Sequence, residues 1–411
     1  AVPLLSDDCR NTSVDEDWVA DMIQLSQPAP AERTRTYLHL MRTARNMFAA
    51  DELEQLVPRQ RTAPRLSELN GDGMSGIDPI AGTEALAYDF LARGGKFARP
   101  FITLASYDAV GGGECTLADG AAKSAQLSPA IRRVALSIEA FHKASLVHDD
   151  IQDDDSFRYG QATVHREHGV PTAINVGDYL IGLGYRLAAH DVPQLGPDVA
   201  CDILAKLSES HTKLSEGQGA ELLWQDPRDK GLEPLDALKI YSLKTAPAFE
   251  AAMYCGLRLA GSAEKYEQRI KHLARHLGIA FQILNDLKDW QADEDNKLTV
   301  GADALGGRPT VLWALALKSL GSEDRRQLQS LVESNVASPQ VVETIRTLYE
   351  RADVFSQARS LVDKHQARAE AEADQLEPDE LRRLAYYLID TVLDRGEVSE
   401  PEVVPLVTAS P

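Results

Sequence analysis

The most concentrated group of carboxylates in the chain lies in HKASLVHDDIQDDD, residues 142–155. On a helix, Asp149 and Asp153 are one turn apart and share a face, and Asp150 lies beside them. Oxygen ligands of this kind suit Mg²⁺, and crowded like charges are costly unless a cation neutralises them. His142 lies two turns before Asp149 on the same face. The segment indicates a cation site, with a solvated acidic helix end as the alternative.

The residues before these carboxylates favour the cation site. Apolar side chains recur there at helical spacing, at Ile131, Val134, Ile138, Phe141 and Leu146. The carboxylates therefore emerge from an amphipathic or buried helix rather than from a linker.

A second acidic group lies in FQILNDLKDW, residues 281–290. Asn285 and Asp289 are four residues apart, and Asp286 and Asp289 are three apart, on another apolar helix. Two such helix ends facing each other would hold three Mg²⁺ ions around a diphosphate, because Mg²⁺ takes octahedral oxygen ligands and shares them with substrate phosphates. Taken alone, this second group is weak support for a metal site.

Basic residues form a third group in GGKFARP, residues 94–100. Lys96 and Arg99 follow a helix and a glycine turn. Lysine binds phosphate as a point charge and arginine binds it with two hydrogen bonds. A helix C-cap with cations that complement the helix dipole accounts for the same residues.

Composition excludes several classes of function. The formal net charge of −20 would repel a phosphate backbone, so no nucleic-acid partner is expected. The four cysteines are widely spaced, with no Cys-x-x-Cys pair for zinc or redox chemistry. No apolar run reaches the length of about 18 residues that spans a bilayer, and the first residues lack a signal-peptide pattern. We therefore expect no transmembrane segment and a cytoplasmic protein.

Helices are expected to position all of these groups. Ala and Leu are abundant and β-branched alternation is rare, so almost no strand is expected. Helix follows helix over residues 81–393, with no internal repeat, which favours one large helical domain. Residues 1–80 are expected to form an N-terminal extension with one helix near residues 34–56, and the acidic residues 394–411 a disordered tail.

In their order along the chain, these segments resemble the trans-isoprenyl (polyprenyl) diphosphate synthase family over residues 81–393. The motifs that carry the resemblance are GGKFARP, HKASLVHDDIQDD, FRYGQATVH, LSEGQGAEL, LKTAPAF, FQILNDLKD and NKLTVGADALGGRPT. It implies an all-α fold, a single large helical bundle of the isoprenoid synthase type with a central active-site cavity. It also implies a homodimeric, Mg²⁺-dependent prenyltransferase that condenses isopentenyl diphosphate with an allylic diphosphate.

The resemblance implies a role for each matching residue. The magnesium ligands would be Asp149, Asp153, Asn285 and Asp289. The groups implied in ionising the allylic diphosphate are Asp149, Asp150, Asp153, Arg158, Lys244, Gln282, Asp286 and Asp289. The groups implied in binding substrates are Lys96, Arg99, His142, Tyr159, Gln218, Thr245, Lys297 and Arg308, of which Lys96, Arg99 and His142 would hold the diphosphate of isopentenyl diphosphate.

Four positions depart from the family pattern. Tyr159 stands where the family usually has a second Arg for isopentenyl diphosphate, so the sequence predicts that Tyr159→Arg would improve binding of that substrate. Asn285 replaces the leading Asp of the second motif and carries one negative charge fewer. Glu221 and Arg308 replace Asp and Lys, which keeps the charge and changes the reach.

Three functions fit this pattern. In elongation, loss of diphosphate gives an allylic carbocation that the double bond of isopentenyl diphosphate attacks, and released pyrophosphate removes the proton. In a class I terpene cyclase, an internal double bond attacks instead; Tyr159 and Asn285 favour this alternative, whereas Lys96, Arg99 and His142 oppose it. A non-catalytic partner subunit of a prenyl synthase is the third. The sequence favours elongation.

Product length is expected to depend on the helix that carries the first motif, because in this fold the growing chain runs along it. Ala144 and Ser145 are small and would let a farnesyl tail pass, whereas Phe141 on the next turn is bulky. This predicts a geranylgeranyl-length or slightly longer product. Close helix packing is an alternative reason for the two small residues.

Overall fold

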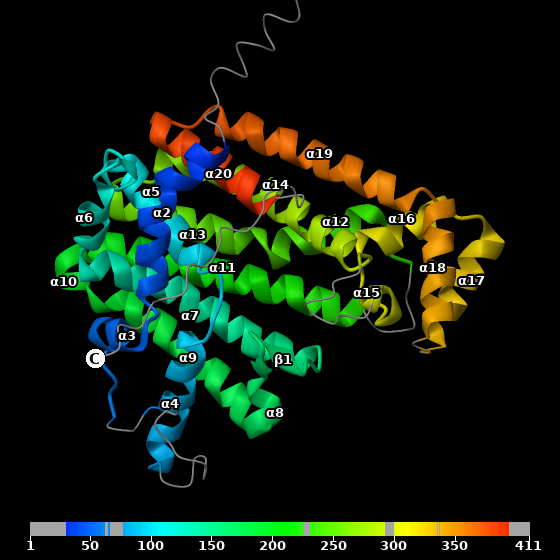
Figure 1. Ribbon diagram of the computed structural model, residues 1–411, viewed down its shortest axis with the longest axis horizontal. Coiled ribbons are helices and arrows are strands. Elements are labelled where there is room, and N and C mark those ends of the chain that lie inside the picture. The colour runs from blue at the N-terminus through cyan, green and yellow to red at the C-terminus, as the bar shows by residue number, and fades with distance from the viewer. Residues whose placement is uncertain are drawn as a thin grey trace, which may run out of the picture.

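The computed structural model describes residues 30–61, 65, 77–224, 231–291, 300–334, 336 and 338–393, with the backbone alone for residues 30–36. Long helices run side by side across the molecule, and α15 to α18 gather at one end (Figure 1). Helix α7 packs on α9, α11 on α13, α13 on α5 and α14, and α14 on α19. The expected all-α bundle of the isoprenoid synthase type is confirmed.

The elements follow one another in a simple order. Up to the second strand they are α2 (Pro30–Asn46), α3 (Ala50–Leu56), α4 (Pro79–Ala92), α5 (Ala98–Val110), the 3₁₀ helix η3 (Glu114–Thr116), α6 (Gly120–Ala125), α7 (Pro129–Gln152), β1 (Phe157–Arg158) and β2 (Gln161–Ala162). The middle of the chain forms α8 (Val164–His168), α9 (Val170–His190), α10 (Val192–Leu195), α11 (Pro197–Trp224), α12 (Pro234–Lys244), α13 (Ala246–Ala260) and α14 (Glu264–Lys288). The last helices are α15 (Ala302–Leu305), α16 (Val311–Ser319), α17 (Ser322–Glu333), α18 (Pro339–Arg351), α19 (Val354–Ala373) and α20 (Asp379–Val392).

The helix α7 begins where its sequence directs. Ser128 caps it by accepting a hydrogen bond from the Ile131 N–H, and Pro129 occupies the first helical position. The helix then runs for 24 residues through the core, and Asp153 is its C-cap. The first acidic motif therefore lies at the C-terminal end of a long, buried helix.

A two-residue hairpin follows α7. Phe157 pairs with Ala162 and Arg158 with Gln161 in antiparallel register. Both turn residues have positive φ, 54° at Tyr159 and 75° at Gly160, as a type I′ turn requires. The hairpin directs Arg158 back toward the end of α7.

A break between two helices brings a second polar segment to the centre of the bundle. Thr245 ends α12 and precedes α13, with φ −125° and ψ −47°. Glycines let neighbouring helices approach this break closely: a Cβ on Gly217 would lie 2.6 Å from the Lys244 backbone nitrogen, and one on Gly278 would lie 2.9 Å from that of Ala246. Lys244 and Thr245 are thus held between α11 and α14.

The helix expected near residues 34–56 is two helices, α2 and α3, separated at Met47–Ala49. Met47 and Phe48 are buried at the break, and the Phe48 ring stacks on Phe97 at a centroid distance of 4.4 Å. Both helices contribute to the same hydrophobic core as the rest of the chain. The boundary of the extension near residue 80 stays a prediction, and residues 394–411 lie outside the described part.

No helix in the described ranges is long and apolar enough to cross a membrane. Of the cysteines that the structure describes, Cys115 and Cys255 are buried and Cys201 is exposed, and all three are free thiols.

Close packing of α13 on α5 gives a stability prediction. A Cβ on Gly256 would lie 2.2 Å from the Thr103 carbonyl oxygen, so Gly256→Ala should destabilise the protein by about 1–3 kcal/mol through overpacking. Gly182, inside α9, is the matched control, because no atom lies within 4 Å of its added Cβ in the described structure. Urea denaturation of both variants measures the difference; equal stability would contradict the close contact.

Candidate active site

Two helix C-termini carry the acidic motifs. Asp153 is the C-cap of α7 and Asp289 is the C-cap of α14. The C-terminal end of a helix bears the negative end of its dipole, so carboxylates there raise the electrostatic energy instead of lowering it. Compensating cations are therefore required at both ends.

Arg308 links the two acidic ends. Its Nη2 lies 3.2 Å from Asp153 Oδ2, and its Nη1 lies 3.1 Å from Asp303 Oδ1. The Asp303 N–H in turn donates to Asp289 Oδ2 at 3.3 Å, at the beginning of α15. The charges of Asp149 and Glu221 also act on this group, and we call the five carboxylates Asp149, Asp153, Glu221, Asp289 and Asp303 the acidic cleft.

Burial and mutual repulsion leave protons on part of this cleft. Burial raises the pKa of Asp149 to about 6; Lys244 opposes the rise and Asp153 adds to it. Burial, and then the negative charge of Asp303, raise the pKa of Asp289 to about 7. Burial is the larger cause of both shifts, and a cation bound next to these carboxylates would lower both pKa values.

Carboxylates also hold two positively charged side chains, Lys244 and Arg158, at the cleft. Lys244 Nζ lies 2.9 Å from both carboxylate oxygens of Glu221. Arg158 Nε donates to Asp150 Oδ1 at 2.8 Å, and its Nη2 also reaches Asp155. Asp150 is buried, and its Oδ2 has no hydrogen-bond partner in the described part of the chain. Asp150 thus holds Arg158 in place.

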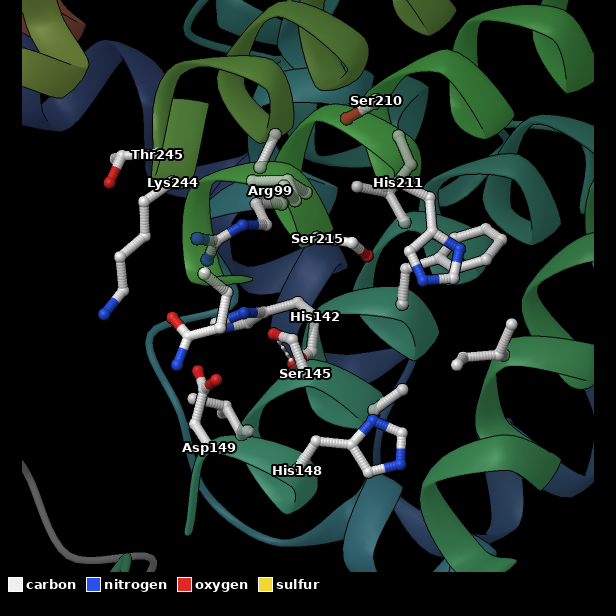
Figure 2. Close-up of a pocket in the computed structure, with 18 of the residues that line it drawn as sticks. Arg99, His142, Ser145, His148, Asp149, Ser210, His211, Ser215, Lys244 and Thr245 are labelled. Atoms are coloured by element: carbon white, nitrogen blue, oxygen red, sulfur yellow. Dashed lines mark hydrogen bonds between the residues drawn. The ribbon is translucent and has the colours of Figure 1, made fainter. Parts of the chain in front are cut away.

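A cavity of about 400 Å³ begins at this cleft. Ten of the predicted site residues line it: Arg99, Phe141, His142, Ala144, Ser145, Asp149, Gln218, Lys244, Thr245 and Gln282. Gln282 Nε2 donates to Thr245 Oγ1 at 2.5 Å, and Gln218 Nε2 donates to Gln152 Oε1 at 2.8 Å. Asp149 and Lys244 lie on one side of the cavity and His148 and His211 on the other (Figure 2).

Phe141 and His211 line the side of the cavity away from the acids, and Tyr185 packs against both rings. The Phe141 ring lies edge-on to Tyr185 at 4.7 Å between centroids, and 5.6 Å from the His211 imidazole. Tyr185 Oη and His211 Nδ1 are 3.3 Å apart. Gly184 makes room for Phe141, since an added Cβ would lie 2.8 Å from its ring. The sequence singled out Phe141 alone, because Tyr185 and His211 lie far from it along the chain.

The other predicted residues differ in burial. Asp286 requires a correction: it is buried in the core, where Tyr241 donates to its Oδ2 and the Val311 N–H donates to the Tyr241 hydroxyl. Burial raises its pKa well above the ordinary value, so it does not supply charge to the cleft. Asn285 and Lys96 are exposed, and Lys297 lies outside the described residues.

Asp303 is the carboxylate that sequence reasoning missed. It occurs within NKLTVGADALGGRPT, one of the matched motifs, but no spacing rule connects it with Asp289 across the intervening segment. Only the hydrogen bond to Asp289 and the ion pair with Arg308 reveal its position.

Comparison with known proteins identifies the family. The profile described as Polyprenyl synthetase matches residues 83–349, well over half of the chain. The chain belongs to the polyprenyl synthetase family. The protein is accordingly a prenyltransferase, and it has the isoprenoid synthase fold.

Relatives of this polyprenyl synthetase make products of different lengths. A short chain isoprenyl diphosphate synthase of Methanothermobacter thermautotrophicus is 29% identical over 306 residues, 74% of this chain and 88% of the relative. The octaprenyl diphosphate synthase of Escherichia coli is 28% identical over 66% of this chain and 79% of its own length. The relatives alone therefore do not determine product length.

Solved structures show the same fold. The geranylgeranyl pyrophosphate synthetase of Pyrococcus horikoshii superposes with a TM-score of 0.68 at 24% identity, covering 88% of this chain and 98% of that one. A geranylgeranyl pyrophosphate synthase of Corynebacterium glutamicum, complexed with isoprenyl diphosphate and magnesium, gives 0.66 at 20% identity, covering 90% of this chain and 100% of that one.

The raised pKa of Asp289 gives a pH prediction for the metal-free protein. Above pH about 4 the unfolded chain releases a proton that the folded protein keeps until about pH 7. The stability contributed by that proton is present below pH about 4 and is lost as the pH rises through about 7. Relative to Asp289→Asn, the parent should therefore lose stability from pH 5 to 8. Urea denaturation in chelator checks this, and parallel pH profiles would contradict it.

Proposed function

We propose that this polyprenyl synthetase condenses isopentenyl diphosphate with an allylic diphosphate to give a geranylgeranyl-length or longer all-trans prenyl diphosphate. The observation that carries the proposal is the cavity. Asp149 and Lys244 line one side of it, and Phe141 and His211 line the side where Tyr185 packs against them. Such a cavity suits a substrate with an anionic head and an apolar tail.

The donors at the cleft fit magnesium. Asp149, Asp153, Asn285 and Asp289 offer the hard oxygen ligands that Mg²⁺ prefers, and Asp303 adds another carboxylate. Within the described residues no three acidic, histidine or cysteine side chains converge closely enough to hold an ion by themselves. This supports ions that share their ligands with the diphosphate, and we retain three as the proposed number. Bound magnesium would neutralise charge on the departing diphosphate.

The protein's own groups have separate tasks in this mechanism. Lys244 and Arg158, each held by a carboxylate, stabilise the leaving diphosphate as the bond to C1 breaks. Thr245 and Gln282, joined by a hydrogen bond, and Gln218 line the region where the cation forms. The double bond of isopentenyl diphosphate attacks C1 of the allylic cation. The released pyrophosphate then takes a proton from C2 of the isopentenyl unit, so no protein nucleophile is required.

The second substrate is proposed to bind near Lys96, Arg99 and His142. Arg99 and His142 point toward the centre of the cavity in Figure 2. The Arg99 Nε is buried with no hydrogen-bond partner among the described residues, so a donor is left for an anionic ligand. Burial, and then Arg99 and Lys143, lower the pKa of His142 well below its ordinary value, so His142 binds as a neutral group.

One incubation tests the function. The purified protein, Mg²⁺ and farnesyl diphosphate are combined with and without isopentenyl diphosphate, and the products are analysed. We expect a longer prenyl diphosphate only when both substrates are present. A cyclic terpene from farnesyl diphosphate alone would favour a cyclase, and no product in either mixture would favour a partner subunit. A homodimer and a cytoplasmic location remain parts of the proposal.

Removing one carboxylate tests the metal site. Asp149→Ala or Asp153→Ala should lower turnover about a thousandfold or more without unfolding the protein, because charge neutralisation at the leaving group is lost. Asp198→Ala, an exposed aspartate at the start of α11, is the matched control and should retain the parent rate. Near-parent turnover of either cleft variant at saturating Mg²⁺ would exclude that residue as a ligand.

Chain length depends on the aromatic end of the cavity in this proposal. Ala144 is buried and lines the cavity, so Ala144→Phe should shorten the product by one or more isoprene units. Phe141→Ala should lengthen it, because the ring that meets Tyr185 and His211 is removed. Product chromatography beside the parent decides, and unchanged length in both variants would place the limit on another helix.

A further inference from the structure

Lys143, in the helix α7, is buried in an unusual environment. It is completely inaccessible to solvent, whereas lysine is seldom fully buried unless it is paired. Its ammonium group donates to the Arg93 carbonyl oxygen and, at 2.6 Å, to the Gly94 carbonyl oxygen. The catalytic steps described above make no use of it. Its burial therefore requires a separate reason.

Three aromatic rings enclose the same ammonium group. Its Nζ lies 4.1 Å from the centroid of the Tyr159 ring, 5.4 Å from that of Phe90 and 5.7 Å from that of Phe97. These distances are within the range of cation–π attraction. Glu139, one turn earlier in α7, is also buried and attracts both Lys143 and Arg99. A positive charge is thus maintained beneath the glycine turn that precedes Lys96.

The hydrogen bonds of Lys143 determine the direction of the N–H groups in the same peptide bonds. In a trans peptide the C=O and N–H groups point in opposite directions. Because Lys143 binds the carbonyl oxygens of Arg93 and Gly94, the N–H groups of Gly94 and Gly95 point away from it. Both glycines are exposed, and neither amide donates to an acceptor within the described ranges. Two outward N–H groups beside Lys96 form an arrangement suited to a phosphate.

Tyr159 is adapted to this arrangement. Gly94 leaves room for it, since an added Cβ would lie 3.2 Å from the Tyr159 Cβ and Cγ. Burial raises the pKa of Tyr159 to about 12, so its phenol is neutral and its ring face can meet the ammonium group. An Arg at position 159 would instead put a second cation against Lys143.

We propose that Lys143 is a positioning residue for the second diphosphate: it orients the Gly94 and Gly95 amides toward that group and places beneath them the positive charge that Tyr159 does not supply. This inference rests on the proposed function, since it assumes that isopentenyl diphosphate binds beside Lys96 and Arg99. It changes the expectation from sequence for Tyr159→Arg. Tyr159→Arg alone should instead raise the KM for isopentenyl diphosphate, because the new guanidinium group would repel the Lys143 ammonium group.

The test is steady-state kinetics with each substrate varied in turn. Lys143→Met should raise the KM for isopentenyl diphosphate about ten- to a hundredfold, the effect of losing charge-assisted hydrogen bonds, and should leave the KM for the allylic substrate unchanged. Lys206→Met is the matched control. Lys206 is also largely buried, pairs with Glu250 at 3.0 Å and lies over Tyr254, but it is remote from the turn in sequence and makes no contact with it. It should alter neither KM.

Two double variants separate positioning from a role in folding. Lys143→Met with Glu139→Gln removes both charges of that pair, and because Glu139 also attracts Arg99, Glu139→Gln alone is the reference. The double variant should fold and raise the KM for isopentenyl diphosphate above that of Glu139→Gln. Lys143→Met with Tyr159→Arg restores one cation and should bind isopentenyl diphosphate better than either single variant. A KM for isopentenyl diphosphate that stays at the parent value in both Lys143→Met forms, or that rises equally for both substrates, would overturn the proposal.

Calorimetric titration of isopentenyl diphosphate alone, without the allylic substrate, distinguishes failure here from failure of the proposed function. The proposal is supported, even without turnover, if the parent binds isopentenyl diphosphate and the Lys143→Met forms bind it with an affinity lower by about tenfold or more. A parent that elongates, with Lys143→Met binding unchanged, overturns this inference and leaves the function intact. A parent that neither binds nor uses isopentenyl diphosphate overturns both.

Discussion

Repulsion between carboxylates at the ends of two long helices is the constraint on which the site depends. Asp153 and Asp289 cap α7 and α14 at the end where the helix dipole is already negative. Burial adds to the cost of charge there, which is why Asp149 and Asp289 have raised pKa values. The fold tolerates this because Arg308 bridges the two ends, and because a cation and a diphosphate can complete the charge balance.

The two sides of the proposed reaction use different means to hold negative charge. At the acidic cleft the protein supplies carboxylates, so positive charge must come from metal ions as well as from Lys244 and Arg158. At the glycine turn it supplies positive charge directly, through Arg99, Lys96 and, in our inference, the buried Lys143. In the proposed reaction, this division accounts for the binding of two diphosphates by a chain with a net charge of −20.

Close helix contacts position several of the residues that line the cavity. Gly217 and Gly278 allow α11 and α14 to approach the break at Lys244 and Thr245, and Gly184 accommodates the Phe141 ring. Larger residues at these positions would separate the helices and displace the groups that line the cavity. These glycines therefore help to determine where Lys244, Thr245 and Phe141 lie at the cavity.

The sequence by itself determined the helical class and the family, because helical spacing of apolar residues and motif order are local properties that survive without coordinates. It also pointed to Asp149, Asp153 and Lys244 and to ten of the residues that line the cavity. Only the tertiary structure decided that Asp286 belongs to the core, that Asp303 belongs to the cleft, and that Lys143 lies beneath Tyr159. The physical reason is that burial, ion pairs and ring contacts form between segments that are distant in the chain. The spacing of residues within one helix shows which of them share a face, but it does not show which helix packs against that face.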